Sequence, residues 1–228
     1  MNCIAHRGFA GVDAENTLPA IVGAAERADG VEVDLRRCGS GEIVVHHDET
    51  VDRTTNGSGP LSAYSAGELA DLFVEGTDAG VPTFARVVEA VPATTTLHVE
   101  LKETGIWPDA RAVLAAADAA PSVVVSSFAG GQLRAVEGYP TALLVTEAPG
   151  AIRRARDLGC AGIHPSIETC SSTLVTAAHE ADLTVNAWTV TEPAETARLR
   201  ELGVDGVITD FPACCPGAVA DRAVGGPQ

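Results

Sequence analysis

The segment that constrains this chain most strongly reads Gly30-Val31-Glu32-Val33-Asp34-Leu35-Arg36. Successive side chains of a β-strand point to opposite faces, so its three apolar residues share one face while Glu32 and Asp34 share the other. The apolar face is suited to packing against helices, which puts the two carboxylates on the inner side of a barrel. Burying an uncompensated carboxylate costs several kcal/mol, so this strand predicts a cation or a wet pocket beside it.

Residues 96–102 repeat this arrangement. Their apolar residues alternate with His98, Glu100 and Lys102, which we expect to point inward. Glu100 then joins Glu32 and Asp34 at one mouth of the barrel, where barrel enzymes place their active sites. Three carboxylates form an all-oxygen ligand set, which suits a hard divalent cation such as Mg²⁺ or Ca²⁺. The alternative is an ion-pair network in which Lys102, Arg7 and Arg36 neutralise the acids.

The rest of the chain alternates short apolar runs with alanine-rich helical stretches, the pattern of repeated βα units. We expect strands over residues 2–6, 30–36, 96–102, 122–127, 141–145, 161–164, 184–188 and 206–209. We expect helices over residues 17–28, 83–91, 108–119, 131–136, 148–158, 172–181 and 193–202. Eight such units predict an α/β fold, a closed (β/α)8 TIM barrel. A doubly wound open sheet is the alternative, but no glycine-rich phosphate turn follows the first strand.

The length of 228 residues fits one barrel domain, which we place at residues 1–217. A short extension strand over residues 42–47 follows the second barrel strand. The polar stretch 48–82 comes next, with a short helix over residues 66–72, and is too long for a plain connector. We therefore expect a small functional insertion there. Residues 218–228 are expected to form a frayed tail.

The charge balance excludes some classes of partner. The chain has 31 acidic and 15 basic residues, a net charge of -16, and Lys102 is its single lysine. Such a surface repels nucleic acid and anionic membranes, so we expect a small-molecule substrate, no nucleic acid and no stable membrane association. Acid-rich, lysine-poor composition is typical of halophilic proteins, whose self-repulsion is screened by salt. The sequence carries no signal for an oligomeric state.

The expected localisation is cytoplasmic. The chain enters a strand-like segment at once, which leaves no room for a signal peptide, and no run of about 18 apolar residues occurs. The six cysteines lack a Cys-x-x-Cys spacing. We therefore expect them to be reduced and to act as small apolar residues.

Histidines stand beside the predicted carboxylate mouth. His6 ends the first strand, and His46 and His47 end the extension strand, so one of these two can join His6. A pair of imidazoles beside a divalent ion suits acid–base work on a phosphate ester. His98 lies deeper and is interpreted as a satisfied core residue. His164 also ends a strand, but no partner motif supports a role for it.

The ordered motifs of the chain resemble those of the glycerophosphodiester phosphodiesterase family. The matching segments span Ile4 to Pro212 and differ from the family pattern mainly at Thr191, where an asparagine is usual. They are His6-Arg7-Gly8, Glu15-Asn16-Thr17, Glu32-Val33-Asp34, His47-Asp48, the run 52–59, Glu100-Leu101-Lys102, Ser126-Ser127-Phe128, Trp188-Thr189-Val190 and the run 203–212.

This resemblance implies a metal-dependent phosphodiesterase that releases glycerol phosphate and an alcohol. It implies Glu32, Asp34 and Glu100 as ligands of Mg²⁺ or Ca²⁺ and His6 with His47, not His46, as the acid–base pair. Arg7 and Lys102 would bind the phosphate oxygens. We expect Trp188 and Phe211 to form an apolar wall for the glycerol, with a role as caps of the core as the alternative for these strand-end aromatics. Glu15 and Asn16 would position Arg7 or the metal site, with N-capping of the first helix as the alternative role of Asn16.

Other functions on the same barrel are conceivable. A phospholipase D-like or lysophospholipid phosphodiesterase, or a phosphoinositide-cleaving relative, would act at a membrane surface, for which the acidic chain is poorly suited. A barrel that binds phosphate compounds without catalysis would be expected to lack one or more of the five catalytic and metal-ligating residues. All five are present.

Overall fold

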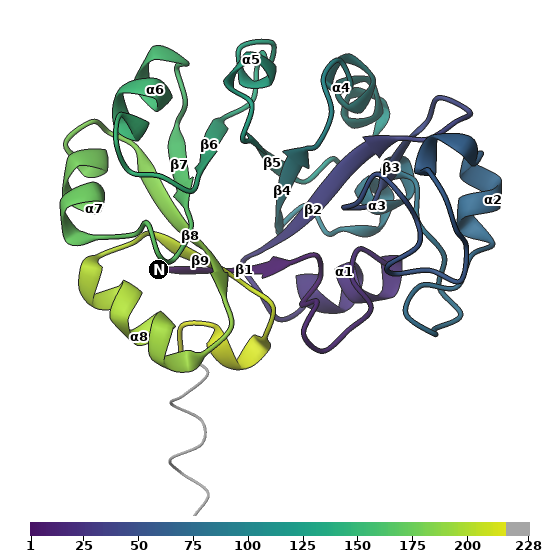
Figure 1. Ribbon diagram of the computed structural model, residues 1–228, viewed down its shortest axis with the longest axis horizontal. Coiled ribbons are helices and arrows are strands. Elements are labelled where there is room, and N and C mark those ends of the chain that lie inside the picture. The colour runs from purple at the N-terminus through teal and green to yellow at the C-terminus, as the bar shows by residue number, and fades with distance from the viewer. Residues whose placement is uncertain (218–228) are drawn as a thin grey trace, which may run out of the picture.

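Eight parallel strands close into a barrel in the computed structural model, which describes residues 1–217 (Figure 1). The sheet order runs β1-β9-β8-β7-β6-β5-β4-β2, and pairing of β1 with β2 closes the ring. The barrel strands are β1 (Asn2–His6), β2 (Gly30–Arg37), β4 (Thr96–Leu101), β5 (Ser122–Ser127), β6 (Thr141–Val145), β7 (Gly162–Pro165), β8 (Thr184–Val190) and β9 (Gly206–Thr209). This confirms the predicted TIM barrel.

Helices surround the strands on the outside, as Figure 1 shows when the barrel is viewed from one end. The helices between barrel strands are α1 (Leu18–Ala25), α3 (Phe84–Ala90), α4 (Trp107–Ala116), α5 (Gly130–Leu133), α6 (Ala151–Asp157), α7 (Ser172–His179) and α8 (Pro193–Leu202). A final 3₁₀ turn, η2 (Pro212–Cys214), follows β9. Every predicted βα unit is present, and the expected tail lies outside the described residues.

Several helices are shorter than predicted, for local reasons. Helix α1 begins only after Thr17, whose side-chain oxygen caps the helix by accepting the Ala20 N–H. Helix α6 begins at Ala151 and not at residue 148, because Gly150 precedes it in the left-handed conformation at φ 74°. Helix α8 has its predicted bounds, since Gly203 ends it at φ 83°.

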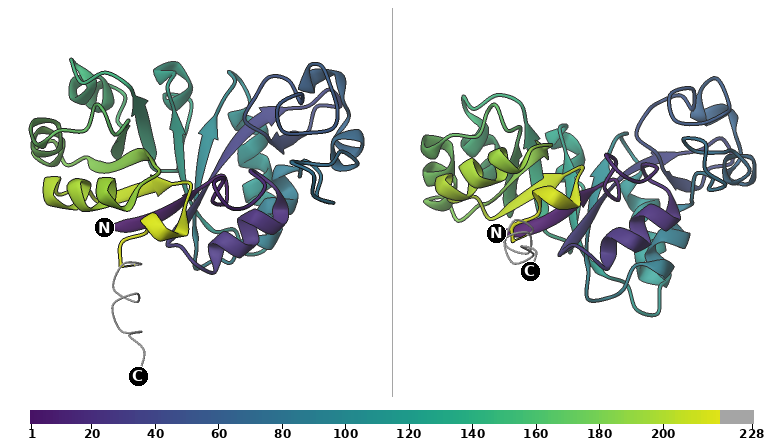
Figure 2. Two further views of the ribbon diagram at one scale, coloured as in Figure 1. Left: turned by 60° about the horizontal axis from the view of Figure 1, so that its bottom comes forward. Right: turned by 90° about the horizontal axis from the view of Figure 1, so that it is seen from below.

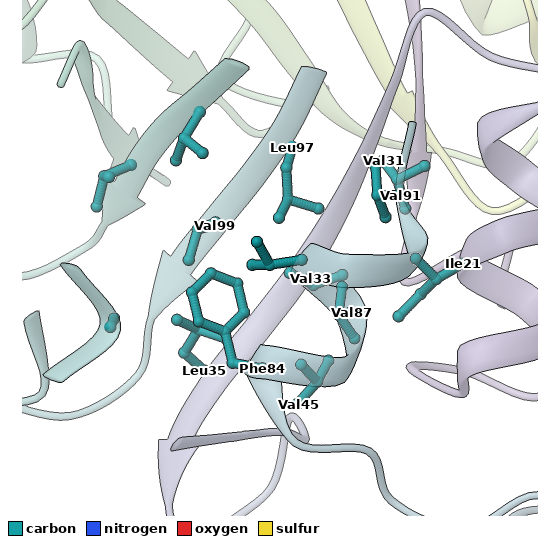
Figure 3. Packing of buried hydrophobic residues seen from close by; sticks show 14 of the residues in the cluster. Ile21, Val31, Val33, Leu35, Val45, Phe84, Val87, Val91, Leu97 and Val99 are labelled. Carbon is teal, nitrogen blue, oxygen red and sulfur yellow. The ribbon is translucent and has the colours of Figure 1, made fainter. Parts of the chain in front are cut away.

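The apolar faces of β2 and β4 pack against helix α3, as the alternation of residues predicts (Figure 3). Phe84 and Val87 of α3 lie over Val33 of β2 and Val99 of β4, and all four are fully buried. In the register of these two strands, Asp34 pairs with Glu100 and Glu32 with His98. The acids therefore face the barrel interior together.

An insertion joins β2 to α3. It begins with β3 (Ile43–Val45), which pairs antiparallel with β2, and continues through η1 (Leu61–Ala63) and α2 (Ala66–Ala70). Its own small core includes Val51, Leu61 and Leu69. The segment, coloured blue, lies at one side of the barrel in both views of Figure 2. The predicted insertion is thus a packed unit and not an open loop.

The prediction that all cysteines are reduced is wrong. Cys3 of β1 and Cys215, just after η2, form a disulfide across a sequence separation of 212 residues. Barrel closure brings β9 beside β1, so the two ends of the domain meet, and sequence spacing does not reveal this. Disulfides are rare in cytosolic proteins, so one ground for expecting a cytoplasmic location is lost. Within residues 1–217 no helix has the length and apolar character needed to cross a membrane.

Two histidines face the barrel interior. His98 is buried with Nδ1 lacking a partner among the described residues, so the expectation of a satisfied core residue is wrong. His164 Nε2 accepts a hydrogen bond from the Asn186 amide at 3.1 Å. Burial lowers the pKa of His98 to about 4, and burial together with His98 lowers the pKa of His164 to about 3. Both imidazoles are therefore neutral in the folded protein.

We expect acid to destabilise the fold through His164. Its pKa is lower in the folded protein than the ordinary value of 6.5, so its contribution to stability is complete above pH 6.5 and is lost as the pH falls toward about 3. His164→Gln cannot take up a proton there. Between pH 7 and pH 4 the wild type should lose up to about 3 kcal/mol more unfolding free energy than His164→Gln, measured by urea denaturation. Parallel losses in the two proteins would contradict this, and exposed His179→Gln serves as the control.

Candidate active site

A pocket of about 170 Å³ opens at the carboxyl ends of the barrel strands. Every barrel strand contributes at least one side chain to its lining. These are His6, Glu32, Glu100, Ser126, Leu144, His164, Trp188 and Ile208. Arg7, His47, Lys102, Phe128 and Thr189 complete the lining. One side of the pocket is charged, from β1, β2 and β4, and the other side is neutral.

The predicted carboxylate cluster lies on the charged side. Glu32, Asp34 and Glu100 each offer one oxygen, and the three oxygens lie within 4.8 Å of one another. Lys102 Nζ lies 2.8 Å from Glu100 Oε1 and 3.3 Å from Asp34 Oδ1. Arg7 Nε lies 3.1 Å from Asp34 Oδ2. Two of the three cations in the alternative ion-pair network are thus present. Both contact Asp34, and Lys102 also contacts Glu100.

These two cations do not balance the cluster. Burial, with Asp34 and Glu100 next to it, raises the pKa of Glu32 well above its ordinary value. Burial and Asp34 raise the pKa of Glu100. Burial alone would also raise the pKa of Asp34, but Arg7 and Lys102 outweigh it and lower that pKa. The two glutamates therefore retain unbalanced repulsion, which a divalent cation would remove.

Arg36, the third cation of the alternative, lies elsewhere. Its Nε donates to the backbone oxygen of His47 at 2.8 Å, and its terminal nitrogen lies 3.4 Å from Glu103. It makes no ion pair with the carboxylate cluster among the described residues. The ion-pair network therefore lacks one of the charges it needs.

Asn16 completes the surroundings of the cluster. Its amide nitrogen donates to Asp34 Oδ2 at 2.9 Å, while its Oδ1 is buried and has no partner among residues 1–217. Asp34 Oδ1 likewise accepts no hydrogen bond, although Lys102 is near. Two unpartnered oxygens beside three carboxylates fit a hard cation. The N-cap alternative for Asn16 is wrong, because Thr17 caps α1.

The turn after β1 holds Arg7 against the cluster. Arg7 has a left-handed backbone at φ 51°, and its N–H donates to the backbone oxygen of Glu32 at 3.0 Å. Gly8 follows at φ 81°, where a Cβ would lie 2.8 Å from the Ala20 carbonyl carbon. Glycine is required here by both the conformation and the close approach. The Arg7 terminal nitrogen donates to Glu15 at 3.1 Å.

Two histidines in the pocket are oriented in the same way. His6 Nδ1 lies 2.6 Å from Asp210 Oδ1, and His47 Nδ1 lies 2.6 Å from Asp48 Oδ1. A carboxylate accepts and cannot donate, so each imidazole carries its hydrogen on Nδ1 when neutral and leaves Nε2 free for substrate. Burial lowers the pKa of His47, although Asp34 acts in the opposite direction. The geometry thus provides two oriented imidazoles beside the carboxylates.

His46 serves a different purpose. It is buried, and its Nε2 lies 3.1 Å from the Thr50 carbonyl oxygen within the insertion. It does not line the pocket, whereas His47 does. Residue spacing alone leaves the choice between the two histidines open, and His47 is the one that lines the pocket.

The neutral side of the pocket has an aromatic wall. Trp188 and Phe128 meet edge to face with ring centroids 5.6 Å apart, and the Trp188 ring nitrogen donates to the His164 carbonyl oxygen at 2.7 Å. Phe211, expected beside Trp188, does not line the pocket and packs against Gly11 instead. Phe128 occupies the expected place.

Sequence reasoning missed the residues that orient the histidines. Asp210 and Asp48 stand inside quoted motifs, but nothing local assigns them a partner, since Asp210 is 204 positions from His6. Phe128 also lies in a quoted motif. Glu15, expected to position Arg7 or the metal site, accepts a hydrogen bond from Arg7 at 3.1 Å. Both of its carboxylate oxygens are also engaged by Arg53, and it does not line the pocket.

The sequence of this chain is similar to that of known proteins. The sequence model of the "Glycerophosphoryl diester phosphodiesterase family" matches residues 6–214. The chain is 31% identical to a glycerophosphodiester phosphodiesterase of Bacillus altitudinis, covering 96% of this chain and 95% of the relative. It is 32% identical to a glycerophosphodiester phosphodiesterase of Caldanaerobacter subterraneus, covering 92% and 93%.

Solved structures of other proteins have the same fold as this chain. An Oleispira antarctica phosphodiesterase in complex with the product sn-glycerol-3-phosphate matches with a TM-score of 0.88 and 26% identity over 96% of this chain and 97% of that one. A Thermotoga maritima glycerophosphodiester phosphodiesterase matches with a TM-score of 0.79 and 25% identity, covering 97% of each chain.

The unbalanced carboxylates predict how the protein responds to divalent ions. Addition of Mg²⁺ or Ca²⁺ at about 100 times its dissociation constant should stabilise the fold by about 2.7 kcal/mol, measured as a rise in Tm by calorimetry. Glu32→Gln should abolish that rise. It should also leave the metal-free protein as stable as the wild type or more stable, because it removes repulsion. If instead Glu32→Gln destabilised the metal-free protein and left the response to ions intact, the carboxylates would serve an ion-pair network.

Proposed function

The chain belongs to the glycerophosphoryl diester phosphodiesterase family, and from that premise we propose a metal-dependent hydrolysis with a histidine pair. The substrate is a glycerophosphodiester, and the products are glycerol phosphate and a free alcohol. One observation carries the proposal: two imidazoles, each oriented by a carboxylate 2.6 Å from its Nδ1, line the same pocket as Glu32 and Glu100.

The metal ligands in this proposal are Glu32, Asp34 and Glu100. Their oxygens favour Mg²⁺ or Ca²⁺ over zinc, which prefers histidine and cysteine. A bound divalent cation supplies charge neutralisation and polarisation of the phosphate. Asn16 holds Asp34 in place through its amide. The raised pKa values of Glu32 and Glu100 support this assignment, since both follow from burial and from neighbouring negative charge.

The phosphate diester binds between the cluster and the cations of the pocket. Lys102 and Arg7 line the pocket and offer N–H donors to the phosphate oxygens, where negative charge grows in the transition state. Burial would lower the pKa of Lys102, but Asp34 and Glu100 raise it further, so the ammonium stays charged. The only lysine of the chain is thus held permanently cationic beside the phosphate.

His6 and His47 move the protons. One imidazole takes a proton at Nε2 from the nucleophile, which is water or the free glycerol hydroxyl of the substrate. Attack by the hydroxyl would give a cyclic phosphate, which water must then open to yield glycerol phosphate. The other imidazole, which enters the reaction as the imidazolium with a second hydrogen on Nε2, donates that proton to the departing alcohol oxygen. Asp210 binds Nδ1 of His6 and Asp48 binds Nδ1 of His47. The Nε2 atom of each ring therefore points away from its aspartate. The pair therefore needs no rearrangement between the two proton transfers.

The neutral side of the pocket receives the organic part of the substrate. Trp188 and Phe128 provide an apolar wall there, in place of the expected pair of Trp188 and Phe211. The volume of about 170 Å³ lies below the roughly 300–1,000 Å³ of pockets that enclose drug-sized ligands. This supports a small deacylated diester over the membrane phospholipids of the phospholipase alternatives.

The acidic surface points to a salt-rich working medium. The net charge of -16 makes the compact state repel itself, and about 1 M salt reduces the Debye length to about 3 Å. Activity is therefore best measured at high salt.

We expect the protein to release glycerol phosphate from glycerophosphocholine in high salt, measured with a coupled dehydrogenase assay. Complete removal of metal with a chelator should abolish release, and Mg²⁺ or Ca²⁺ should restore it. Turnover that survives complete metal removal would contradict the metal assignment, and absence of release from every glycerophosphodiester would contradict the substrate.

His6→Ala and His47→Ala should each lower kcat by about 10²–10⁴-fold, because each removes a proton-transfer group. His179→Ala is the matched control, since His179 also pairs with a carboxylate, Asp205 at 3.0 Å, but on the surface and outside the pocket. Near-normal turnover of either pocket variant would remove the acid–base pair from the mechanism.

A further inference from the structure

A chain of charges connects the insertion to the turn after β1, and of its members the proposed chemistry uses only Asp48. Arg53 of the insertion points its guanidinium at two carboxylates. Its Nε lies 2.5 Å from Asp48 Oδ2, and its two terminal nitrogens lie 2.9 and 2.7 Å from the two oxygens of Glu15. Asp48 uses its other oxygen to accept from His47 Nδ1. The guanidinium is therefore joined to the His47 ring through one carboxylate.

We propose that Arg53 and Glu15 form a clamp that positions His47 by holding Asp48 against its Nδ1. The proposal rests on the proposed role of His47 and deepens it. In this arrangement Glu15 is the anchor, Arg53 the bridge and Asp48 the group that touches the imidazole. Arg53 is a positioning residue, since it does not line the pocket.

The anchor is fixed on several sides. Glu15 is only 8% exposed, and besides Arg53 it accepts a hydrogen bond from Arg7 at 3.1 Å. Its backbone N–H donates to Glu75 Oε2 of the insertion at 3.2 Å. Arg53 itself is about half exposed, at 48% of its side chain. A half-exposed arginine is thus held in place by a buried carboxylate, and the residue that bears this carboxylate is also hydrogen-bonded to the insertion through its backbone.

The geometry requires arginine in particular. A planar guanidinium presents its N–H groups as a fixed fork, so it can bind Glu15 with one edge and Asp48 with Nε at the same time. A lysine ammonium is a point charge without that fork. It could meet one of the two carboxylates but could not set the angle between them.

The backbone of His47 is held independently of the clamp. Arg36 Nε donates to the His47 carbonyl oxygen at 2.8 Å, and Arg36 also pairs with Glu103. Loss of the clamp should therefore leave the end of the extension strand in place while freeing Asp48 and the imidazole ring. This separates a positioning role from a purely structural one.

The two roles differ in what they predict for the tautomer of His47. With Asp48 held on Nδ1, the neutral ring carries its hydrogen at Nδ1 and presents Nε2 to substrate. Without the clamp the ring can exchange tautomers and turn. A clamp that merely fastens the insertion would change stability and leave the tautomer of His47 unaltered.

The test compares Arg53→Gln and Arg53→Lys with the wild type and with Arg27→Gln. Arg27 is the matched control, because it is 44% exposed and pairs with a carboxylate, Asp13 at 2.9 Å, that makes no hydrogen bond to a pocket histidine among the described residues. We expect Arg53→Gln to lower kcat on glycerophosphocholine about 10–100-fold, as loss of a partner that orients a catalytic ligand does, with KM changed less than about threefold. Arg53→Lys should recover only a small part of that loss, and Arg27→Gln should match the wild type.

The tautomer provides a readout that does not depend on turnover. Long-range ¹H–¹⁵N spectra of the six histidines should show His47 protonated at Nδ1 in the wild type and a mixed tautomer in Arg53→Gln, with Asp48→Asn as the reference for a lost carboxylate. Wild-type kcat in folded Arg53→Gln, or an unchanged His47 tautomer, would overturn the clamp. If Arg53→Gln does not fold, Arg53→Lys is read by the same criteria. Lack of any wild-type turnover would instead count against the proposed function, while the spectra would still decide whether the clamp exists.

Discussion

Like charges repel most strongly where water is scarce, and the mouth of this barrel holds three carboxylates within 4.8 Å of one another. Neighbouring cations and a hydrogen-bond donor offset part of that repulsion. Arg7 and Lys102 pair with Asp34, and Asn16 donates to it, so the central acid stays ionised. Glu32 and Glu100 are left with excess negative charge, which a divalent cation fits. The left-handed backbone of the turn after β1 contributes as well, because it brings Arg7 into contact with the carboxylate cluster.

A second constraint is the direction of the histidine rings. An imidazole is useful in acid–base work only when the correct nitrogen faces the substrate, and here a carboxylate fixes each ring from behind. The two carboxylates come from distant parts of the fold. Asp210 follows the last barrel strand, and Asp48 opens the insertion. Barrel closure therefore orients one histidine, and the docking of the insertion orients the other.

The division of the pocket into a charged and a neutral side follows from strand order. Residues within or directly after β1, β2 and β4 provide the acids and cations, whereas β5 to β9 provide Ser126, Leu144, His164, Trp188 and Ile208. A phosphodiester has the same two parts, a charged phosphate and a neutral organic group. The fold thus provides a charged side that matches the phosphate and a neutral side that matches the organic group.

Sequence alone determined what depends on neighbours in the chain. Alternation with a period of two put Glu32, Asp34 and Glu100 on inner faces, and the repeated βα pattern predicted the barrel, because strand faces and element order are local properties. Tertiary structure alone decided the contacts between residues far apart, since closure of the ring and docking of the insertion bring them together. Four contacts arise in this way: the Cys3–Cys215 disulfide, the hydrogen bond of His6 with Asp210, the aromatic contact of Phe128 with Trp188 and the hydrogen bonds of Arg53 to Glu15. None of these contacts has a spacing signature, because the chain between the partners does not determine the distance between them.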